Sequence, residues 1–169
     1  MAIPPPPQGW TRYLVVSMFG MGRKFRVLDA NTEAEIYVAD GKVGVRPTCE
    51  VKDVNGTVIY SIRGQLFAIP KRMDITDAAG DAVAQLRAKA FSLFKNRMTL
   101  TVPNGSPWEL EGSLIEKNYS ISRDGAPVAH ITQKWMTIRD RYTLDVADGV
   151  DPALALAIVW AVDRWVERD

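Results

Sequence analysis

The chain has 169 residues, which is enough for one domain with its own hydrophobic core. Its 21 Lys and Arg nearly balance its 20 Asp and Glu, leaving a net charge of +1 and no global positive field that would favour nucleic-acid binding. The single cysteine, Cys49, excludes an internal disulfide framework and a multi-thiolate zinc site. We therefore expect one domain in a reducing compartment, the cytoplasm, with no nucleic-acid partner.

The first nine residues, Met1-Ala-Ile-Pro-Pro-Pro-Pro-Gln-Gly9, contain four consecutive prolines. A proline run favours an extended polyproline II conformation. The segment lacks the basic start and apolar core of a secretory signal. We expect a flexible arm over residues 1–9 and a single domain over residues 10–169. Two roles stay open for the arm, a disordered leader or a docking peptide for a proline-reading partner.

From about residue 12 onward one pattern recurs: an alternating strand, a turn, a second strand and a basic loop. Within a strand such as Met98-Thr-Leu-Thr-Val102, apolar and polar residues alternate, which indicates one buried face. Near-periodic recurrence is typical of repeated supersecondary units. The units begin 21 to 25 residues apart, at Phe25, Cys49, Met73, Met98, Tyr119 and Tyr142.

Turn residues separate the two strands of a unit. Asp53-Val-Asn-Gly56 and Asp77-Ala-Ala-Gly80 place Asp, Asn and Gly where the chain must reverse. A strand is expected over about 12–19, and first strands are expected to start near 24, 48, 72, 97, 118 and 141. Second strands are expected near 34–45, 57–67, 82–91, 108–115 and 127–137, which makes twelve strands in all.

The sixth unit ends in a helix instead of a second strand. Asp151-Pro152 supplies a helix cap and a proline at the first helical position. The ten residues from Ala153 to Val162 have no polar face, and they are too few to cross a bilayer, which needs about 20. Twelve strands enclose more space than side chains fill. We therefore predict an all-β fold with one helix: a closed, twelve-stranded antiparallel β-barrel around a buried hydrophobic C-terminal helix over about 152–167.

Two sets of residues resemble the LURP-one-related family, over about Tyr13 to Val166. One set is the Lys-aromatic endings Lys89-Ala-Phe91 and Lys134-Trp135. The other is the closing segment Tyr142-Thr-Leu-Asp-Val-Ala-Asp-Gly-Val-Asp-Pro-Ala-Leu-Ala-Leu-Ala-Ile-Val159, in which residues 146–154 are the most specific.

This family belongs to a wider group with the Tubby C-terminal domain and the phospholipid scramblases. The resemblance implies a twelve-stranded barrel around a hydrophobic helix. Tubby-type domains bind phosphoinositide headgroups through basic residues, so the resemblance also implies a lipid-binding role. The cysteine-rich palmitoylated stretch and the acidic calcium-binding segment of scramblases have no counterpart here, so scramblase-like lipid movement is not expected.

Catalytic chemistry finds little support. The register places His130 on the outer, solvated face and Cys49 on the inner, buried face. Asp145, Asp148 and Asp151 are explained by a strand end, a turn and a helix cap, and they lack the pattern of a calcium loop. Because no paired nucleophile and base is found, we expect no enzyme, no metal and no cofactor. A carrier of small apolar ligands is disfavoured, since the helix would occupy the barrel interior.

The basic clusters carry the functional hypothesis. They occupy equivalent positions just before the next strand, so they should gather at one end of the barrel as a basic rim. The clusters are Arg23-Lys24, Lys71-Arg72, Lys95-Asn96-Arg97 and Arg139-Asp-Arg141. The aromatic residues Phe67, Phe91, Phe94 and Trp135 lie close by in sequence, and cations beside aromatics suit a headgroup-binding site. The alternative is a solvated rim that guards strand ends. The candidate binding residues are Lys71, Arg72, Lys89, Lys95, Arg97, Lys134, Arg139 and Arg141.

The leading hypothesis is thus a non-enzymatic β-barrel that binds anionic phospholipid headgroups as a peripheral protein at a membrane surface, without a membrane-spanning segment. The alternative is a protein-interaction or regulatory scaffold, with the proline arm or a barrel face contacting another protein.

Overall fold

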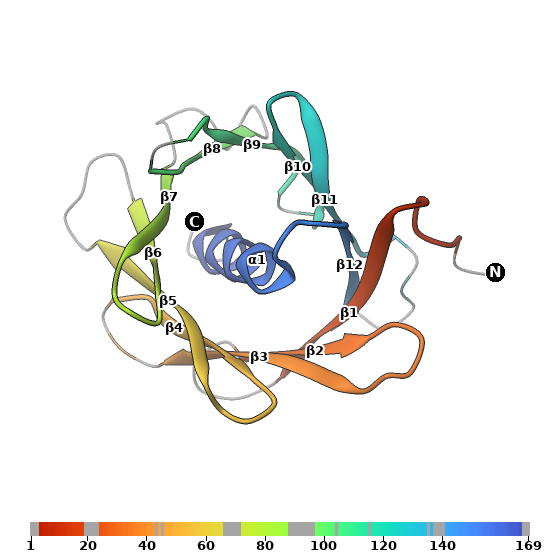
Figure 1. Ribbon diagram of the computed structural model, residues 1–169, viewed down its shortest axis with the longest axis horizontal. Helices are drawn as coiled ribbons and strands as arrows, with labels where there is room; N and C mark the ends of the chain where they lie inside the picture. The colour runs from red at the N-terminus through yellow and green to blue at the C-terminus, as the bar shows by residue number, and fades with distance from the viewer. Residues whose placement is uncertain are drawn as a thin grey trace.

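A computed structural model describes residues 4–18, 24–42, 44, 46–65, 72–87, 97–103, 105–114, 116–134, 136 and 141–166. Over these residues, twelve antiparallel strands close into one barrel, in which every strand pairs with its neighbours in sequence and the first strand pairs with the last (Figure 1). A single helix lies inside the barrel (Figure 1). The predicted fold class is confirmed.

The strands follow the expected order closely. They are β1 (Trp10–Met18), β2 (Lys24–Asp29), β3 (Glu35–Lys42), β4 (Thr48–Asp53), β5 (Val58–Gln65), β6 (Arg72–Asp77), β7 (Ala82–Arg87), β8 (Arg97–Thr101), β9 (Trp108–Ser113), β10 (Asn118–Arg123), β11 (Ala126–Thr132) and β12 (Arg141–Ala147). The helix, α1, spans Pro152–Val166.

The alternation in the sequence separates the interior of the barrel from its exterior. In β4, Cys49 and Val51 are fully buried, whereas Glu50 between them lies on the outer face and forms ion pairs there. The hairpin turns are held by their aspartates: the Oδ1 atom of Asp53 accepts hydrogen bonds from the backbone N–H groups of Asn55 (2.9 Å) and Thr57 (3.0 Å). Gly56 follows at φ +83°, a conformation that glycine adopts without strain.

The helix fills the space that twelve strands enclose. Its residues from Ala155 to Val162 are all buried, and Trp160 is the largest fully buried side chain described. The helix lies against β3, β4 and β5, whose buried residues include the small Ala39. Within the described residues, no helix is long and apolar enough to cross a membrane.

The proline segment lies over the outer face of β1. The backbone carbonyl of Pro7 accepts a hydrogen bond from the N–H of Trp10 (3.1 Å), and the carbonyl of Pro4 accepts one from the guanidinium of Arg12. Pro4 to Pro6 line a shallow groove together with outward-facing residues of β1 and with Thr143 of β12. The segment therefore covers part of the seam where the first and last strands meet.

Candidate functional site at the basic rim

One rim of the barrel is formed by the ends of the odd-numbered strands and the starts of the even-numbered strands. We call it the basic rim, because six of its twelve strand ends are Lys or Arg and none is Asp or Glu. The six residues are Lys24, Lys42, Arg72, Arg87, Arg97 and Arg141.

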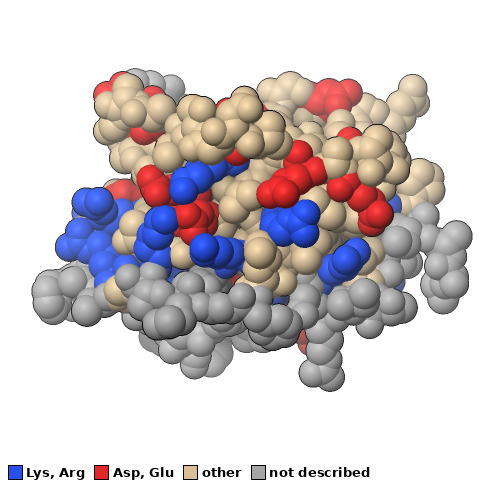
Figure 2. All heavy atoms as spheres, turned by 90° about the horizontal axis from the view of Figure 1, so that it is seen from below, with Lys and Arg blue, Asp and Glu red and all other residues tan. Residues whose placement is uncertain are grey.

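The opposite rim carries the reverse charge. Four of its twelve strand ends are carboxylates and one, Arg123, is basic. We call it the acidic rim and define it by Asp29, Glu35, Asp53 and Asp77. On the face drawn in Figure 2, Lys and Arg gather toward one end of the barrel while Asp and Glu extend to the other.

The helix dipole complements this division. α1 follows β12, so it begins at the acidic rim and ends at the basic rim, where Asp163 pairs with Lys117 (Nζ–Oδ1, 3.0 Å). A helix carries partial positive charge at its N-terminus and partial negative charge at its C-terminus. Each end of the helix therefore meets rim charges of the opposite sign, and the two rims are compatible with the buried helix.

The structure describes only part of the predicted binding set. Arg72, Arg97 and Arg141 are the first residues of β6, β8 and β12, and Lys134 follows β11, so all four belong to the same rim. For Arg97 the backbone alone is described. Lys71, Lys89, Lys95 and Arg139, with the aromatic residues Phe67, Phe91, Phe94 and Trp135, lie outside the described residues.

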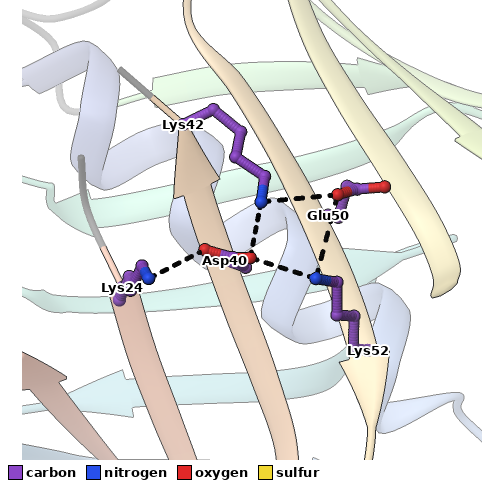
Figure 3. A network of polar contacts seen from close by, with 5 residues as sticks. All are labelled: Lys24, Asp40, Lys42, Glu50 and Lys52. Atoms are coloured by element: carbon purple, nitrogen blue, oxygen red, sulfur yellow. Dashed lines mark hydrogen bonds and ion pairs between the residues drawn. The ribbon is translucent and has the colours of Figure 1, made fainter. Parts of the chain in front are cut away.

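Sequence reasoning missed a lysine network on the outer face of β2, β3 and β4 (Figure 3). Asp40 lies at its centre, with Lys42 at 2.7 Å, Lys52 at 3.0 Å and Lys24 at 3.4 Å. Glu50 adds longer ion pairs to Lys42 (3.7 Å) and Lys52 (3.9 Å). The hydrogen bond from Lys42, followed by that from Lys52, lowers the pKa of Asp40 to about 2 despite partial burial. The two carboxylates thus offset much of the lysine charge on this wall.

A second outward cluster lies on β6 and β7. Arg72 and Arg87 are direct cross-strand partners, and so are Asp74 and Gln85. Gln85 joins the pairs: its Oε1 accepts from Nε of Arg87 (2.5 Å), and its Nε2 donates to Asp74 (2.8 Å). Asp74 in turn pairs with Arg72 (Nε–Oδ1, 3.4 Å). Facing arginines on paired strands repel one another. This arrangement therefore leaves positive charge at the rim.

A polar row crosses β10, β11, β12 and β1. Its members, Ser120, His130, Asp145 and Arg12, are consecutive cross-strand partners. The Oγ of Ser120 lies 3.0 Å from Nδ1 of His130. Asp145 binds Arg12 through both oxygens, at 2.7 and 2.9 Å. His130 thus lies on the outer face as predicted, but it is half-buried rather than fully solvated, and burial lowers its pKa.

Ser120, His130 and Asp145 are the residue types of a Ser-His-Asp catalytic triad, but they are not joined in one chain of hydrogen bonds as the members of a triad are. Among the described residues no hydrogen bond joins His130 to Asp145, whose two oxygens bind Arg12. The other candidate nucleophile, Cys49, is fully buried, and burial is the main cause that raises the pKa of its thiol. The predicted core position of Cys49 is confirmed. Within the described residues, no three His, Cys, Asp or Glu side chains are placed to hold a metal ion.

The fold defines the class of protein as a twelve-stranded antiparallel β-barrel closed around a C-terminal helix. The chain belongs to the LURP-one-related family, whose model matches residues 12–163. The resemblance noted in the sequence is confirmed.

Two comparisons accompany this assignment. The chain is 23% identical to the uncharacterized protein YxjI of Bacillus subtilis over 159 residues, which covers 93% of this chain and 94% of the relative. It is also similar to the X-ray structure of a protein from Arabidopsis thaliana, with 14% identity, a TM-score of 0.43 and coverage of 91% of each chain.

Proposed function

We propose that this protein is a non-enzymatic binding module that engages anionic phospholipid headgroups at a membrane surface through its basic rim. The observation that carries the proposal is the segregation of charge between the two rims. Lys and Arg near an anionic leaflet each contribute about 1 kcal/mol of attraction. Six strand ends on one rim are Lys or Arg, which supports reversible binding, although carboxylates pair with three of them, Lys24, Lys42 and Arg72.

The chemistry of the rim suits phosphate groups. The side chains of Lys24 and Lys42 are 48% and 46% exposed, so they reach solvent while holding Asp40. Arg72 and Arg87 add guanidinium groups, which bind phosphate oxygens through paired hydrogen bonds. The long aliphatic stems of these side chains can follow apolar surface while their charged ends remain hydrated.

The non-enzymatic part of the proposal is supported by the inventory of reactive groups. Cys49 is buried in the core. His130 forms a hydrogen bond with Ser120 on the barrel wall. The strand that carries it, β11, pairs with β10 on one side and β12 on the other. The interior is filled by the helix, whose residues from Ala155 to Val162 are buried.

Sedimentation with vesicles tests the proposal. The protein should pellet with phosphatidylcholine vesicles that contain phosphatidylserine, and not with phosphatidylcholine alone. Added salt should release it, because exposed charges are screened beyond about 8 Å at physiological ionic strength. Equal binding to both vesicles, or binding to neither, would contradict the proposal.

A charge variant with a matched control sharpens this test. Lys42→Gln/Arg87→Gln/Arg141→Gln removes three cations from the basic rim and should weaken binding to anionic vesicles at least tenfold. Arg123→Gln removes a cation from the acidic rim, where it contacts the ring of Trp108, and should leave binding unchanged. Circular dichroism checks that all variants remain folded.

One observation favours a second candidate, a protein-interaction scaffold. Pro4, Pro5 and Pro7 are exposed although the segment lies against β1. Proline-reading domains bind such side chains in aromatic-lined grooves. Affinity capture with the full chain and with Pro4→Ala/Pro5→Ala/Pro7→Ala would test this candidate: a partner lost specifically by the variant supports it, and identical recovery contradicts it.

A further inference from the structure

The outer face of β1 is largely apolar. Val15 is buried inside the barrel, so alternation directs the even-numbered residues of the strand outward. Four of these five outward residues are apolar; the set is Trp10, Arg12, Leu14, Val16 and Met18. On β4, by contrast, the outward residues Glu50 and Lys52 are charged. A contiguous apolar strip on the outside of a protein is typical of a binding surface.

Part of this outer face is already buried. Leu28 of β2 is the cross-strand partner of Leu14, so both side chains lie on the outer face, and Leu28 is only 6% exposed. Thr143 of β12, the partner of Leu14 on the other side, is fully buried. The prolines at positions 4–6 line one groove together with Leu14 and Thr143. The segment before β1 lies outside the barrel and forms one side of this groove (Figure 1).

Arg12 supplies a hydrogen-bond donor to the groove. Its guanidinium donates to the backbone carbonyl of Pro4. The two oxygens of Asp145 hold the same guanidinium at 2.7 and 2.9 Å, and both side chains are nearly buried. Arg12 and Asp145 belong to the paired strands β1 and β12. The barrel wall itself therefore fixes the direction in which this donor points.

The groove has the chemistry that a polyproline II helix requires. Such a helix has no internal hydrogen bonds, so its carbonyl groups accept bonds from a protein donor, and its rings pack in grooves that contain aromatic side chains. Trp10 lines the groove beside the apolar Leu14 and Ala30. Among the described residues that line it, only Arg12 is charged, whereas six charged side chains line the groove over β2 to β4. An uncharged, proline-rich segment therefore suits the groove at the seam.

The proline segment of this chain is held weakly enough to be exchanged. Among the described residues, two hydrogen bonds connect its prolines to β1: one from Arg12, and one from the backbone N–H of Trp10 to Pro7. Of the four prolines only Pro6 is half-buried, and the other three are exposed. The groove still has an open volume of about 460 Å³ beside the segment. Another proline-rich chain can therefore take its place.

We propose that the seam between β1 and β12 is a binding groove for proline-rich segments of other proteins, and that residues 4–7 occupy it until a partner replaces them. The bound segment adopts the polyproline II conformation, accepts the hydrogen bond of Arg12 and packs on Trp10 and Leu14. In the scaffold candidate above, a partner binds the prolines of this chain, whereas here the barrel binds the prolines of the partner. The inference does not depend on lipid binding, because no strand-end cation of the basic rim lines the groove.

A peptide titration followed by NMR tests the proposal. The probe is the peptide Pro-Pro-Pro-Pro-Gln-Gly, which has the sequence of residues 4–9. It is added to the ¹⁵N-labelled parent protein and to the full-length variant Pro4→Gly/Pro5→Gly/Pro6→Gly/Pro7→Gly, whose own segment no longer favours polyproline II. The indole N–H of Trp10 and the Nε–H of Arg12 report on the groove. The peptide Gly-Gly-Gly-Gly-Gln-Gly is the negative control.

Both signals should shift and saturate in the glycine variant, with an apparent Kd at least fivefold lower than in the parent, because a segment tethered beside its groove competes at an effective concentration of about millimolar. No shift in the folded glycine variant, equal affinity in both proteins, or equal binding of the glycine peptide would each contradict the proposal. Thermal unfolding verifies the fold. If the fourfold variant does not fold, Pro6→Gly at the half-buried proline replaces it, with the same expected direction.

Two substitutions in the glycine variant locate the peptide. Trp10→Ala removes the aromatic surface and should weaken peptide binding at least fivefold, as followed by the signal of Arg12. Val38→Ala removes an apolar side chain from the groove over β2 to β4 and should leave binding unchanged. Equal effects of the two substitutions would contradict the proposed location. Light scattering of the parent protein checks the alternative occupant: dimers at the concentrations used would assign the groove to the proline segment of a second copy and overturn the proposal.

Discussion

The hydroxyl of Tyr60 on β5 donates a hydrogen bond to the carboxylate of Asp151, the residue that caps the helix. The other oxygen of this carboxylate accepts a hydrogen bond from the N–H of Ala153 (2.9 Å). Asp151 therefore caps the first turn of α1 and links it by a hydrogen bond to the barrel wall. Burial raises the pKa of Tyr60, and the hydrogen bond to Asp151 raises it further.

The first prediction concerns this connection. Tyr60→Phe should lower the free energy of unfolding by about 1–2 kcal/mol, since one hydrogen bond to a charged group is lost. Asp151→Ala should cost at least as much, because the cap is lost as well. Urea denaturation measures both. The double variant should cost less than the sum of the single variants, and strict additivity would show that the two residues act separately.

The same connection has a pH dependence with a definite sign. The pKa of Tyr60 is higher in the folded state than its ordinary value of 10.0. Its contribution to stability is therefore complete below pH 10 and is lost as the pH rises above that value, when the unfolded chain ionises first. Tyr60→Phe should flatten the alkaline decline of the unfolding free energy. If the alkaline decline is the same in Tyr60→Phe as in the parent protein, ionisable groups other than Tyr60 cause it.

A second prediction concerns Arg12 and Asp145, whose side chains are only 12% and 6% exposed. Removing one member leaves a desolvated charge, so Asp145→Asn or Arg12→Met should each destabilise the protein by about 3–5 kcal/mol. Arg12→Met/Asp145→Leu removes both charges and should recover most of this loss. Denaturation with guanidinium chloride follows the series. A double variant as unstable as the single ones would mean that packing rather than charge dominates.

A third prediction uses Asp40. The surrounding lysines lower its pKa to about 2 from an ordinary value of 3.8. Because the folded-state pKa is depressed, the network stabilises the protein fully above about pH 4 and loses its effect as the pH falls toward 2. In Asp40→Asn the acid-induced decline of the unfolding free energy should be shallower over this range. NMR titration of the carboxyl carbon provides a direct check, and a midpoint near 3.8 would contradict the assignment.

A fourth prediction concerns close packing at Gly112 on β9. Its φ is +127°, and an added Cβ would lie 2.7 Å from the carbonyl oxygen of Asn118 and 2.8 Å from Cα of Tyr119. Gly112→Ala should therefore destabilise the barrel by about 1–3 kcal/mol through strain and overpacking. Gly44→Ala is the matched control, because its Cβ would approach only the carbonyl oxygen of Arg46 at 3.8 Å. Similar thermal unfolding midpoints for the two variants would contradict the explanation by strain and overpacking at Gly112.

Much of the fold could be predicted from the sequence because each unit repeats the same local signals. In β6 the alternation of Met73 and Ile75 with polar residues identifies the buried face, and Asp77 with Gly80 identifies the turn. The apolar run after Asp151 then leaves only the barrel interior for the helix. These signals are local, so they can be recognised without knowing how the strands pair.

The site could be predicted only in part, for a physical reason. Arg72 and Arg141 begin their strands, which places them at one rim, and the repeat in the sequence makes this position recognisable. Lys42 and Arg87 were missed because they end strands rather than begin them. The row from Ser120 to Arg12 depends on registers across four strands, including a bulge after Ile121 and the closure of β12 on β1. No local pattern encodes such pairings.

The pairing of β1 with β12 also determines when the barrel can close during translation. Arg12 and Asp145 are separated by 133 positions, so the barrel cannot close until almost the whole chain has emerged. Until then β1 and each newly made strand present unpaired edges, which are sites for pairing with other chains. Contacts at such long sequence separation also slow folding. Nascent chains of this protein should therefore depend on chaperones until the last strand and the helix are complete.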